Sequence, residues 1–466
     1  MRDKYSAMKN IRADINFAEN TGRLDFKKHS VGIGGVNPKA MNEKIIKGTA
    51  KLKPEIIRIF IQEFFFIEKD NGELDFSMLD KYMKAVNATG ADIMASICIK
   101  PKSLYPVVDE TIWKPNDISR WRYIIGEMAK RYSIENKYVT HWGVANEINI
   151  GEWGGCPYKI ENAADYFEYY KMTVGPILEV YPEAKVGGPS WAGIPDENGC
   201  KFFEEFIGSC IKENIRLDFI CYNVYSDRPE EHANGALRVK NITDKYNDKL
   251  ELYITELNIG IGNEISIEDK AYTSKRAAGL GAILYEFHKR AGFMNTFQYH
   301  LYDQSCDPND FKPFYARHRY MANHWNDEPH RLGLFDNDGN VRPQYFVYSM
   351  LYSMAKNEVA AKVSDSDCDN IKILASNDDR YNTIFITNYS PESTKDLTMS
   401  IYFKNAKEGR ARLKVYRIDG GMKWDGDNFE LIPVENRIAY IHPDFWFSLY
   451  IPADGVVMIA CDYDLI

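Results

Sequence analysis

The sequence predicts an α/β fold, a (β/α)8 TIM barrel followed by a C-terminal antiparallel β-sandwich domain. Two observations predict it. Before about residue 357, short apolar runs rich in β-branched residues alternate eight times with segments of helical periodicity, as expected of βαβ units that close into a barrel. After residue 357 no helix-length pattern recurs, and apolar residues alternate with period two between Asn, Asp, Gly and Pro turns, a pattern typical of a small sandwich.

Each predicted barrel strand is a short apolar run, and a longer segment of helical periodicity follows most of them. We expect the strands at Val31–Gly34, Ile56–Phe64, Asp92–Ile99, Thr140–Ala145, Lys185–Gly188, Phe219–Tyr225, Leu252–Thr255 and Met294–Tyr302. We expect helices at Phe76–Thr89, Ile118–Tyr132, Ala163–Val180, Phe202–Lys212, Lys270–Arg290 and Pro343–Ala355. Asp75 and Asp117 precede two of these helices, where a carboxylate can accept hydrogen bonds from the first free amides.

The chain therefore divides into three predicted parts. Residues 30–357 form the catalytic barrel and residues 358–466 the β-sandwich domain. Residues 1–29 form an N-terminal segment that fits either a further strand of the sandwich or a cover over the barrel floor. A dinucleotide-binding fold is improbable because the first strand leads into GIGGVNP, residues 32–38, instead of a GxGxxG motif.

Composition narrows the class of protein. Of 466 residues 45% are hydrophobic and 27% charged, which is ordinary for a globular chain and argues against disorder or a membrane protein. The net charge of −9 argues against a nucleic-acid partner. Eight cysteines include no CxxC pair and no zinc-site spacing, so we expect no metal and no cofactor. The first 20 residues contain no apolar stretch of the kind found in secretory signal peptides, which favours a cytoplasmic protein. The alternative is an exported protein whose signal peptide has been trimmed.

Two glutamates stand where barrel enzymes place their working residues, at the C-terminal ends of strands. The fourth predicted strand ends at Asn146-Glu147 and the seventh at Glu256, so the carboxylates arrive almost opposite each other across the barrel mouth. Cleavage of a glycosidic bond needs such a pair, an acid for the leaving oxygen and a carboxylate for the developing cation. A lone glutamate at a strand end is more often a salt-bridge partner, but the pair favours catalysis. Glu63 and Asp303 are weaker competitors.

Further residues near the predicted rim are candidates for substrate binding. Arg58 and Tyr225 could keep the nucleophile ionised, although a buried arginine and a packed ring are equally reasonable interpretations. Aromatic residues make up 14% of the chain, and most of them belong to the core. Among those near the rim we expect Trp153 and Trp191 to stack on a sugar, and His300 on the last strand to reach the site. The alternative for each tryptophan is a packed loop anchor.

One loop after the last strand is unusually basic. Arg317, His318 and Arg319 follow one another, and arginine matches a carboxylate with two parallel hydrogen bonds. This spacing suggests the hypothesis that Arg317 and Arg319 clamp a uronic acid. A loop tied to acidic neighbours such as Asp310 is the favoured alternative.

At these residues the sequence resembles the clan A retaining glycoside hydrolases, and most of all family 39, which includes β-xylosidases and α-L-iduronidases. The resemblance rests on Asn146-Glu147, on Glu256 in ITELN, and on GIGG near the first strand. It implies that Glu147 is the acid/base, Glu256 the nucleophile, and Asn146 a ligand of the sugar 2-hydroxyl. Ile148 follows Glu147 where the family usually has Pro, and Asn223 stands where relatives often have His.

The resemblance also implies an activity. We expect a retaining, exo-acting glycosidase, β-xylosidase-like or uronidase-like, with a carbohydrate as its partner and with Asn223 among its binding residues. An endo-acting glycanase of the same clan is one alternative. A catalytically silent sugar-binding protein on the same scaffold is another. Oligomeric state cannot be read from the sequence.

Overall fold

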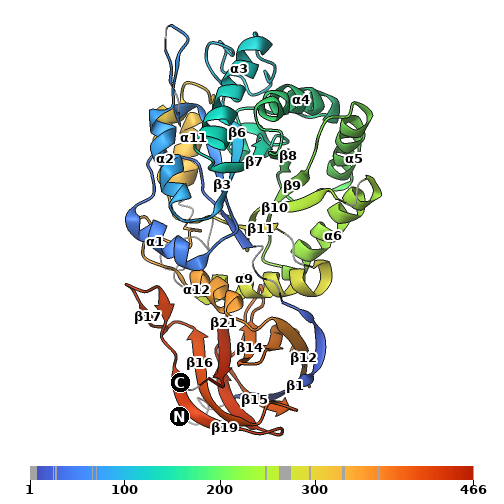
Figure 1. Cartoon of the computed structure of the whole chain (residues 1–466), viewed down its shortest axis with the longest axis vertical. Helices are drawn as coiled ribbons and strands as arrows, with labels where there is room; N and C mark the ends of the chain where they lie inside the picture. The colour runs from blue at the N-terminus through green and yellow to red at the C-terminus, as the bar shows by residue number, and fades with distance from the viewer. Residues whose placement is uncertain are drawn as a thin grey trace.

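The computed structural model describes residues 8–464, apart from residues 25, 27–28, 66, 70, 247–248, 262–273, 293–294, 328–330 and 365–367. Within these limits the chain forms a barrel and a separate sheet domain, which lie one above the other in Figure 1. No helix among the described residues is long and apolar enough to cross a bilayer.

The barrel is closed by eight parallel strands of the described chain, in the order β10-β11-β2-β3-β6-β7-β8-β9. Their alternating side chains point inward and outward in turn. Ile56, Met94, Phe219, Tyr253 and Phe297 form an apolar cluster with Cys221 inside it. The strands are β2 (His29–Gly32), β3 (Ile56–Gln62), β6 (Asp92–Cys98), β7 (Val139–Val144), β8 (Lys185–Trp191), β9 (Phe219–Tyr225), β10 (Glu251–Asn258) and β11 (Asn295–Tyr299).

A helix follows each strand and covers the outside of the barrel (Figure 1). The helices are α1 (Glu43–Leu52), α2 (Ser77–Asn87), α3 (Ile118–Ala129), α4 (Ala163–Val180), α5 (Glu197–Lys212), α6 (Pro229–Tyr246), α9 (Ser274–Glu286) and α12 (Pro343–Tyr352). Asp117 caps α3 by accepting a hydrogen bond from the Arg120 amide at 3.0 Å. Two short helices, α10 (Pro308–Phe311) and α11 (His318–Ala322), lie in the long segment between β11 and α12.

The sheet domain is one continuous nine-stranded sheet of the described chain, ordered β19-β16-β21-β14-β13-β12-β1-β15-β20. All nine strands contribute to a single apolar core, so the sheet curves around it. Its strands are β1 (Lys9–Arg23), β12 (Asn357–Val363), β13 (Ile371–Asn377), β14 (Tyr381–Asn388), β15 (Leu397–Lys404), β16 (Gly409–Ile418), β19 (Glu435–Ile441), β20 (Trp446–Ile451) and β21 (Gly455–Asp462). Two small hairpins, β4–β5 (Ile67–Glu68, Leu74–Asp75) and β17–β18 (Trp424–Asp425, Glu430–Leu431), lie outside both sheets.

The N-terminal segment is part of this sheet. Strand β1 pairs antiparallel with β12 and parallel with β15, and both chain termini lie at this end of the molecule (Figure 1). Of the two positions open to residues 1–29, residues 9–23 occupy the sheet. Phe26, which follows, stacks on His29 of the barrel strand β2 with ring centroids 5.4 Å apart. On the other side, α9 packs against β14, where the Thr387 hydroxyl donates to the Ala278 carbonyl at 2.7 Å.

The barrel and the mostly antiparallel sheet confirm the predicted fold class. Strand β9 and helix α4 have their predicted bounds, because period-two and period-3.6 apolar patterns are unbroken there. The other seven barrel strands differ by one to three residues at an end; for example, β2 begins at His29, two residues earlier than predicted, while β8 extends to Trp191 and β10 to Asn258. Polar side chains at these strand ends interrupt the apolar pattern, although the backbone ladder continues.

Candidate active site

A pocket opens at the C-terminal ends of the barrel strands, with about 500 Å³ of space that is partly open to solvent. Strand ends form its floor, and the loops after β7, β10 and β11 form its walls. Its lining residues are Gly34, Val36, Phe60, Gln62, Asn146, Glu147, Trp153, Gly154, Gly155, Glu256, Ile261, Tyr299, Met321, His324 and Trp325. Both predicted catalytic carboxylates therefore line the same pocket.

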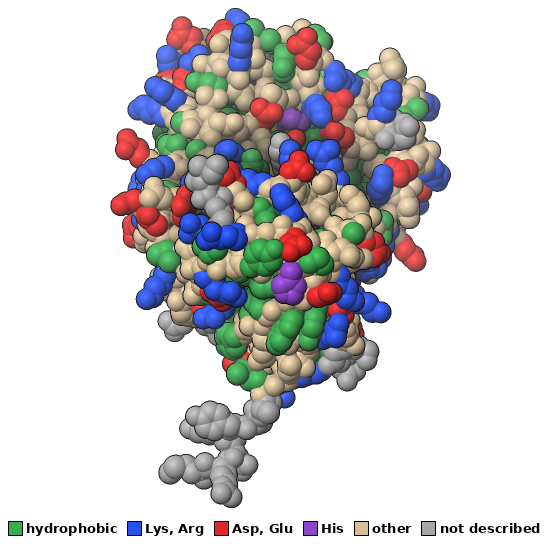
Figure 2. Space-filling model, turned by 60° about the horizontal axis from the view of Figure 1, so that its bottom comes forward, with side chains coloured by type: hydrophobic (Ala, Val, Ile, Leu, Met, Phe, Trp, Pro, Cys, Tyr) green, Lys and Arg blue, Asp and Glu red, His purple; other side chains and the backbone are tan. Residues whose placement is uncertain are grey.

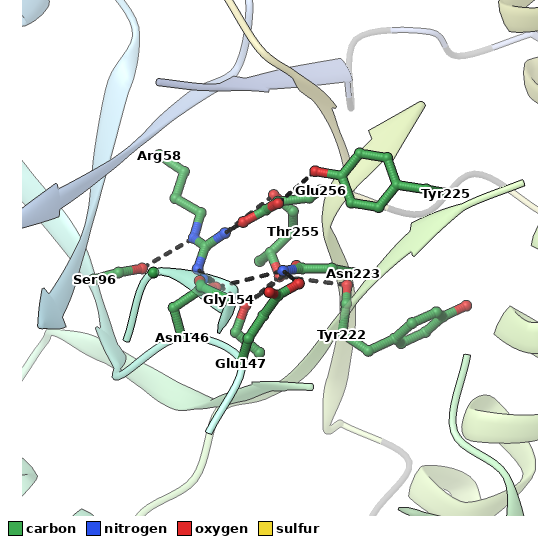
Figure 3. Close-up of polar contacts among 12 residues, drawn as sticks. Arg58, Ser96, Asn146, Glu147, Gly154, Tyr222, Asn223, Tyr225, Thr255 and Glu256 are labelled. Carbon is green, nitrogen blue, oxygen red and sulfur yellow. Dashed lines mark hydrogen bonds and ion pairs between the residues drawn. The ribbon is translucent and has the colours of Figure 1, made fainter. Parts of the chain in front are cut away.

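Arg58 lies beneath the pocket and joins its walls. The two-residue period of β3 points Arg58 into the barrel, where its side chain is 1% exposed. The guanidinium donates to Glu256 Oε1 at 3.0 Å, to Asn146 Oδ1 at 2.7 Å, and to the hydroxyls of Ser96 and Ser190, each at 2.9 Å (Figure 3). Four strands and the Asn146-Glu147 segment are thus held around one planar cation.

Glu256 owes its position to an irregularity in β10. The pairing register of β10 shifts between Ile254 and Glu256 against β9 and between Ile254 and Leu257 against β11, and such a bulge re-aims side chains. As a result two consecutive residues point inward, Thr255 toward Asn223 at 2.8 Å and Glu256 toward Arg58. The Tyr225 hydroxyl donates to Glu256 Oε2 at 2.5 Å, so each carboxylate oxygen has its own donor.

Glu147 occupies a left-handed backbone conformation, with φ of 43°, which is uncommon for a residue with a side chain. Its amide donates to the Ser190 carbonyl at 2.7 Å, which fixes the turn after β7. Gly154 approaches from the following loop so closely that any Cβ there would collide with Glu147 Oε2. A glycine at this position leaves the Glu147 carboxyl accessible from the pocket.

Asn223 lies between the two carboxyl groups (Figure 3). Its Nδ2 donates to Glu147 Oε1 at 2.8 Å and, over a longer distance of 3.4 Å, to Asn146 Oδ1. Its Oδ1 accepts from the Thr255 hydroxyl, which fixes the orientation of the amide. Asn146 also accepts from Arg58, which donates to Glu256, so a short chain of hydrogen bonds connects the two carboxyl groups.

The electrostatics separate the roles of the two glutamates. Burial and the nearby charge of Glu256 raise the pKa of Glu147 to about 8, although the Asn223 hydrogen bond opposes the rise. Burial also raises the pKa of Glu256, but Arg58 and Tyr225 oppose it by favouring the ionised form. Because Glu256 has both the guanidinium and the phenol as donors, the proton that the pair shares at neutral pH resides on Glu147.

The two predicted tryptophans lie in different places. Trp153 lines the pocket and is 52% exposed. Trp191 lies outside the set of described lining residues and packs against α5, with ring centroids 5.0 Å from Phe202 and 5.9 Å from Phe203. The register of β8 shifts between Pro189 and Trp191, so Ser190 points inward and Trp191 outward. Trp191 is therefore a packed loop anchor.

His300 is also outside the described pocket lining. It is fully buried, 5.5 Å from the Trp325 ring, whereas Tyr299 lines the pocket. Strand β11 ends at Tyr299, and the side chain of this last strand residue, not that of His300, faces the pocket. The expectation that His300 reaches the substrate is corrected in favour of Tyr299.

The basic loop is tied to acidic neighbours. Arg317 Nη1 donates to Glu110 Oε1 at 2.6 Å, and the guanidinium lies 5.0 Å from the Trp153 ring centroid. Buried Glu152 accepts hydrogen bonds from the amides of Ala316 and Arg317. Arg319 is exposed, and neither arginine is among the described residues that line the pocket. The contacts favour a structural loop over a carboxylate clamp.

Several functional neighbours have no signal in the sequence. Ser96, Ser190 and Thr255 hold Arg58 and Asn223, yet a lone hydroxyl residue in a strand is common. Gln62 at the end of β3 lines the pocket, as do Met321, His324 and Trp325. Of these, only Trp325 belongs to a pattern that the sequence suggests, the aromatic residues near the rim. In the part of the chain that the structure describes, no three His, Cys, Asp or Glu side chains cluster in a way that could hold a metal ion.

The chain is similar to known proteins over different lengths. A β-xylosidase of Geobacillus stearothermophilus is 26% identical over 165 residues, 33% of this chain and 31% of that protein. An α-1,4-L-rhamnosidase of Formosa agariphila is 28% identical over 200 residues, 40% of this chain and 39% of that protein. The chain thus matches well under half the length of these curated relatives.

The whole fold has a close match among solved structures. A monomeric β-xylosidase of Caulobacter crescentus superimposes with a TM-score of 0.72 over 97% of this chain and 99% of that one, at 18% identity. At this identity the likeness concerns the fold alone. The family model described as glycosyl hydrolases family 39 matches residues 74–399, which is well over half of the 466 residues and includes Glu147 and Glu256. The chain belongs to glycosyl hydrolases family 39.

Proposed function

We propose that the chain is a retaining glycoside hydrolase in which Glu256 is the nucleophile and Glu147 the acid/base. The carrying observation is that both carboxyl groups line one pocket and are connected by hydrogen bonds through Asn223, Asn146 and Arg58. Retaining enzymes hold their carboxyl groups about 5–5.5 Å apart, whereas inverting enzymes leave about 6.5–9.5 Å for a water. The charge of Glu256 contributes to the raised pKa of Glu147, and this supports the shorter separation because such an effect weakens with distance.

The proposed reaction has two steps. Glu256 attacks the anomeric carbon while the bond to the leaving oxygen breaks, and Glu147 gives its proton to that oxygen. Water then attacks the same carbon, Glu147 takes one of its protons, and the ester bond to Glu256 breaks. The raised pKa of Glu147, about 8, keeps its proton available at neutral pH. Arg58 and Tyr225 support the ionised Glu256 that the first step needs.

Asn146 is the proposed ligand of the sugar 2-hydroxyl. Its Oδ1 accepts from Arg58 at 2.7 Å, and its Nδ2 donates to the Gly154 carbonyl at 2.8 Å, so the side chain is held rigidly in the pocket lining. A rigid amide next to the nucleophile can form a hydrogen bond that strengthens as positive charge develops at the anomeric carbon.

The shape of the pocket favours exo action. Trp153 on one loop and Met321, His324 and Trp325 on another stand around the two carboxylates. Such walls suit a terminal sugar better than the interior of a polymer. The relatives differ in the sugar they are named for, a β-xyloside and an α-L-rhamnoside, and we propose a β-xyloside because both the curated relative and the matched solved structure are described as β-xylosidases.

The test is turnover of an aryl glycoside panel of β-xyloside, α-L-rhamnoside and α-L-iduronide by the wild type, E147Q and E256Q. We expect the xyloside to be hydrolysed with retained configuration, as read by proton NMR of the first-formed sugar. Both variants should lose at least about 10³-fold in kcat/KM. Inversion would contradict the mechanism. Binding of sugars without turnover of any glycoside would favour the silent sugar-binding alternative.

A further inference from the structure

A row of planar side chains stands on the outer face of the sheet domain. Tyr402 on β15 is paired with Trp446 on β20, and their rings are stacked, with centroids 5.8 Å apart and planes 18° apart. Arg12 on β1 covers the Tyr402 ring at 3.9 Å from its centroid. The row therefore crosses three neighbouring strands, and Trp446 is its last member.

Trp446 is held in place but not covered. Strand β20 is at the edge of the sheet, so no strand of the described chain lies beyond it, and Trp446 is 56% exposed. Arg12 is fixed by hydrogen bonds to Asp14 at 2.7 and 3.1 Å, and Asp14 also pairs with Lys404 at 3.1 Å. A ring held in this way loses little conformational entropy when a ligand stacks on it.

Hydrogen-bonding groups and a second ring continue the row along the same strand. Ser448 shares the outer face of β20 with Trp446, and its hydroxyl is 2.9 Å from that of Ser400. Tyr450 follows at the same spacing; it is half-buried, with the Arg417 guanidinium 5.1 Å from its ring centroid, and it donates its hydroxyl proton to Asp396 at 2.8 Å. From Trp446 to Tyr450 the strand extends about 14 Å, the length of a short oligosaccharide and too long for a single sugar.

We propose that this strip, Trp446, Ser448 and Tyr450 with Ser400 beside them, binds a segment of a glycan chain. A pyranose has an apolar ring face and a rim of hydroxyls, which match an exposed indole with serine hydroxyls next to it along the strand. The choice of a glycan as ligand rests on the proposed function. The strip lies on β15 and β20 of the sheet domain, which are not barrel strands, so it anchors a polymer and takes no part in the chemistry. Figure 2 turns this end of the molecule forward and shows hydrophobic side chains exposed on it.

The experiment is native electrophoresis of the full chain through gels that contain soluble xylan or soluble mixed-linkage β-glucan, compared with a gel without polymer. The variants are W446A and, as the matched control, Y440A. Tyr440 on β19 is also exposed, at 57%, and its hydroxyl bonds to Glu408. We expect one polymer to retard the wild type and Y440A, and we expect W446A to bind it about tenfold more weakly, equivalent to about 1.4 kcal/mol.

Two further readouts make the outcome decisive. Turnover of the best aryl glycoside should be equal in all three proteins. If none of them turns over any glycoside, the proposed function is refuted, while the retardation of the proteins by the polymer still tests the binding proposal. Equal retardation of W446A and wild type, or no retardation of the wild type by either polymer, would overturn the proposal. So would a larger mass of the wild type than of W446A on size-exclusion chromatography, because Trp446 would then contact a second copy of the chain.

Discussion

The Tyr225 hydroxyl offers a direct test of how the nucleophile is kept ionised. It donates to Glu256 Oε2 at 2.5 Å, and the variant Y225F removes this donor while keeping the ring. A hydrogen bond to a charged group contributes about 1.5–3 kcal/mol, which corresponds to about 1–2 pKa units. Because the bond favours the carboxylate, its loss raises the pKa of Glu256.

The assay is the pH dependence of kcat/KM for an aryl glycoside. On the acidic side the rate follows the ionised fraction of the nucleophile, so the acidic limb should move to higher pH by about 1–2 units. At a fixed pH on that limb, kcat/KM should fall about 10- to 100-fold. The alkaline limb reports the loss of the proton from Glu147, which is bonded to Asn223 and not to Tyr225, and should stay in place.

The control is Y222F. Tyr222 lies on the same strand and is fully buried, and its hydroxyl has no hydrogen-bond partner among the described residues. Its removal should leave both limbs unchanged. If the acidic limb of Y225F stays within about 0.3 units of the wild type, or if Y222F moves it equally, the account of the nucleophile is refuted.

Three other substitutions test separate contacts. N223A removes a hydrogen bond that favours ionised Glu147, so the alkaline limb should move above the wild-type position near pH 8; an unmoved limb in the same pH profile would contradict the assignment. R317A breaks a half-exposed pair with Glu110, so the kcat/KM ratio of iduronide to xyloside should stay within about twofold, and thermal unfolding should show a loss of at most about 1 kcal/mol. A selective loss of uronide turnover would restore the carboxylate clamp. Burial raises the pKa of Glu63 to about 8. The protonated side chain therefore stabilises the folded protein fully below about pH 4.5, and this stabilisation is lost as pH rises toward 8. E63Q cannot ionise, so it should flatten the fall in Tm between pH 5 and 8. An unchanged Tm profile would show that Glu63 is ionised in the folded protein.

The fold and the meeting of Glu147 and Glu256 in one pocket could be predicted because both rest on regular patterns. Alternating strand and helix periodicity indicates the barrel, and the barrel then places strand ends such as Asn146-Glu147 at one rim. The structure brings Arg58, Tyr225 and Asn223 to the same two carboxylates.

Departures from regular pairing explain what the sequence could not predict. The register shift in β8 turns Ser190 inward and Trp191 toward α5, and the shift in β10 points both Thr255 and Glu256 inward. The shift in β8 follows Gly188-Pro189, residue types that often mark a bulge, whereas the shift in β10 involves no such residue type. The partners of Arg317 come from other loops, so its role depends on tertiary contacts that local sequence does not encode.

The central claim is that Glu256 forms a covalent bond to the sugar. The most direct measurement is trapping with a 2-fluoro glycoside that has a good leaving group, followed by peptide mapping of the labelled protein by mass spectrometry. The account predicts one label, on Glu256, in the wild type, and none in E256Q. A label on Glu147 or on any other residue, or turnover without any trapped species and with inverted product, would contradict it.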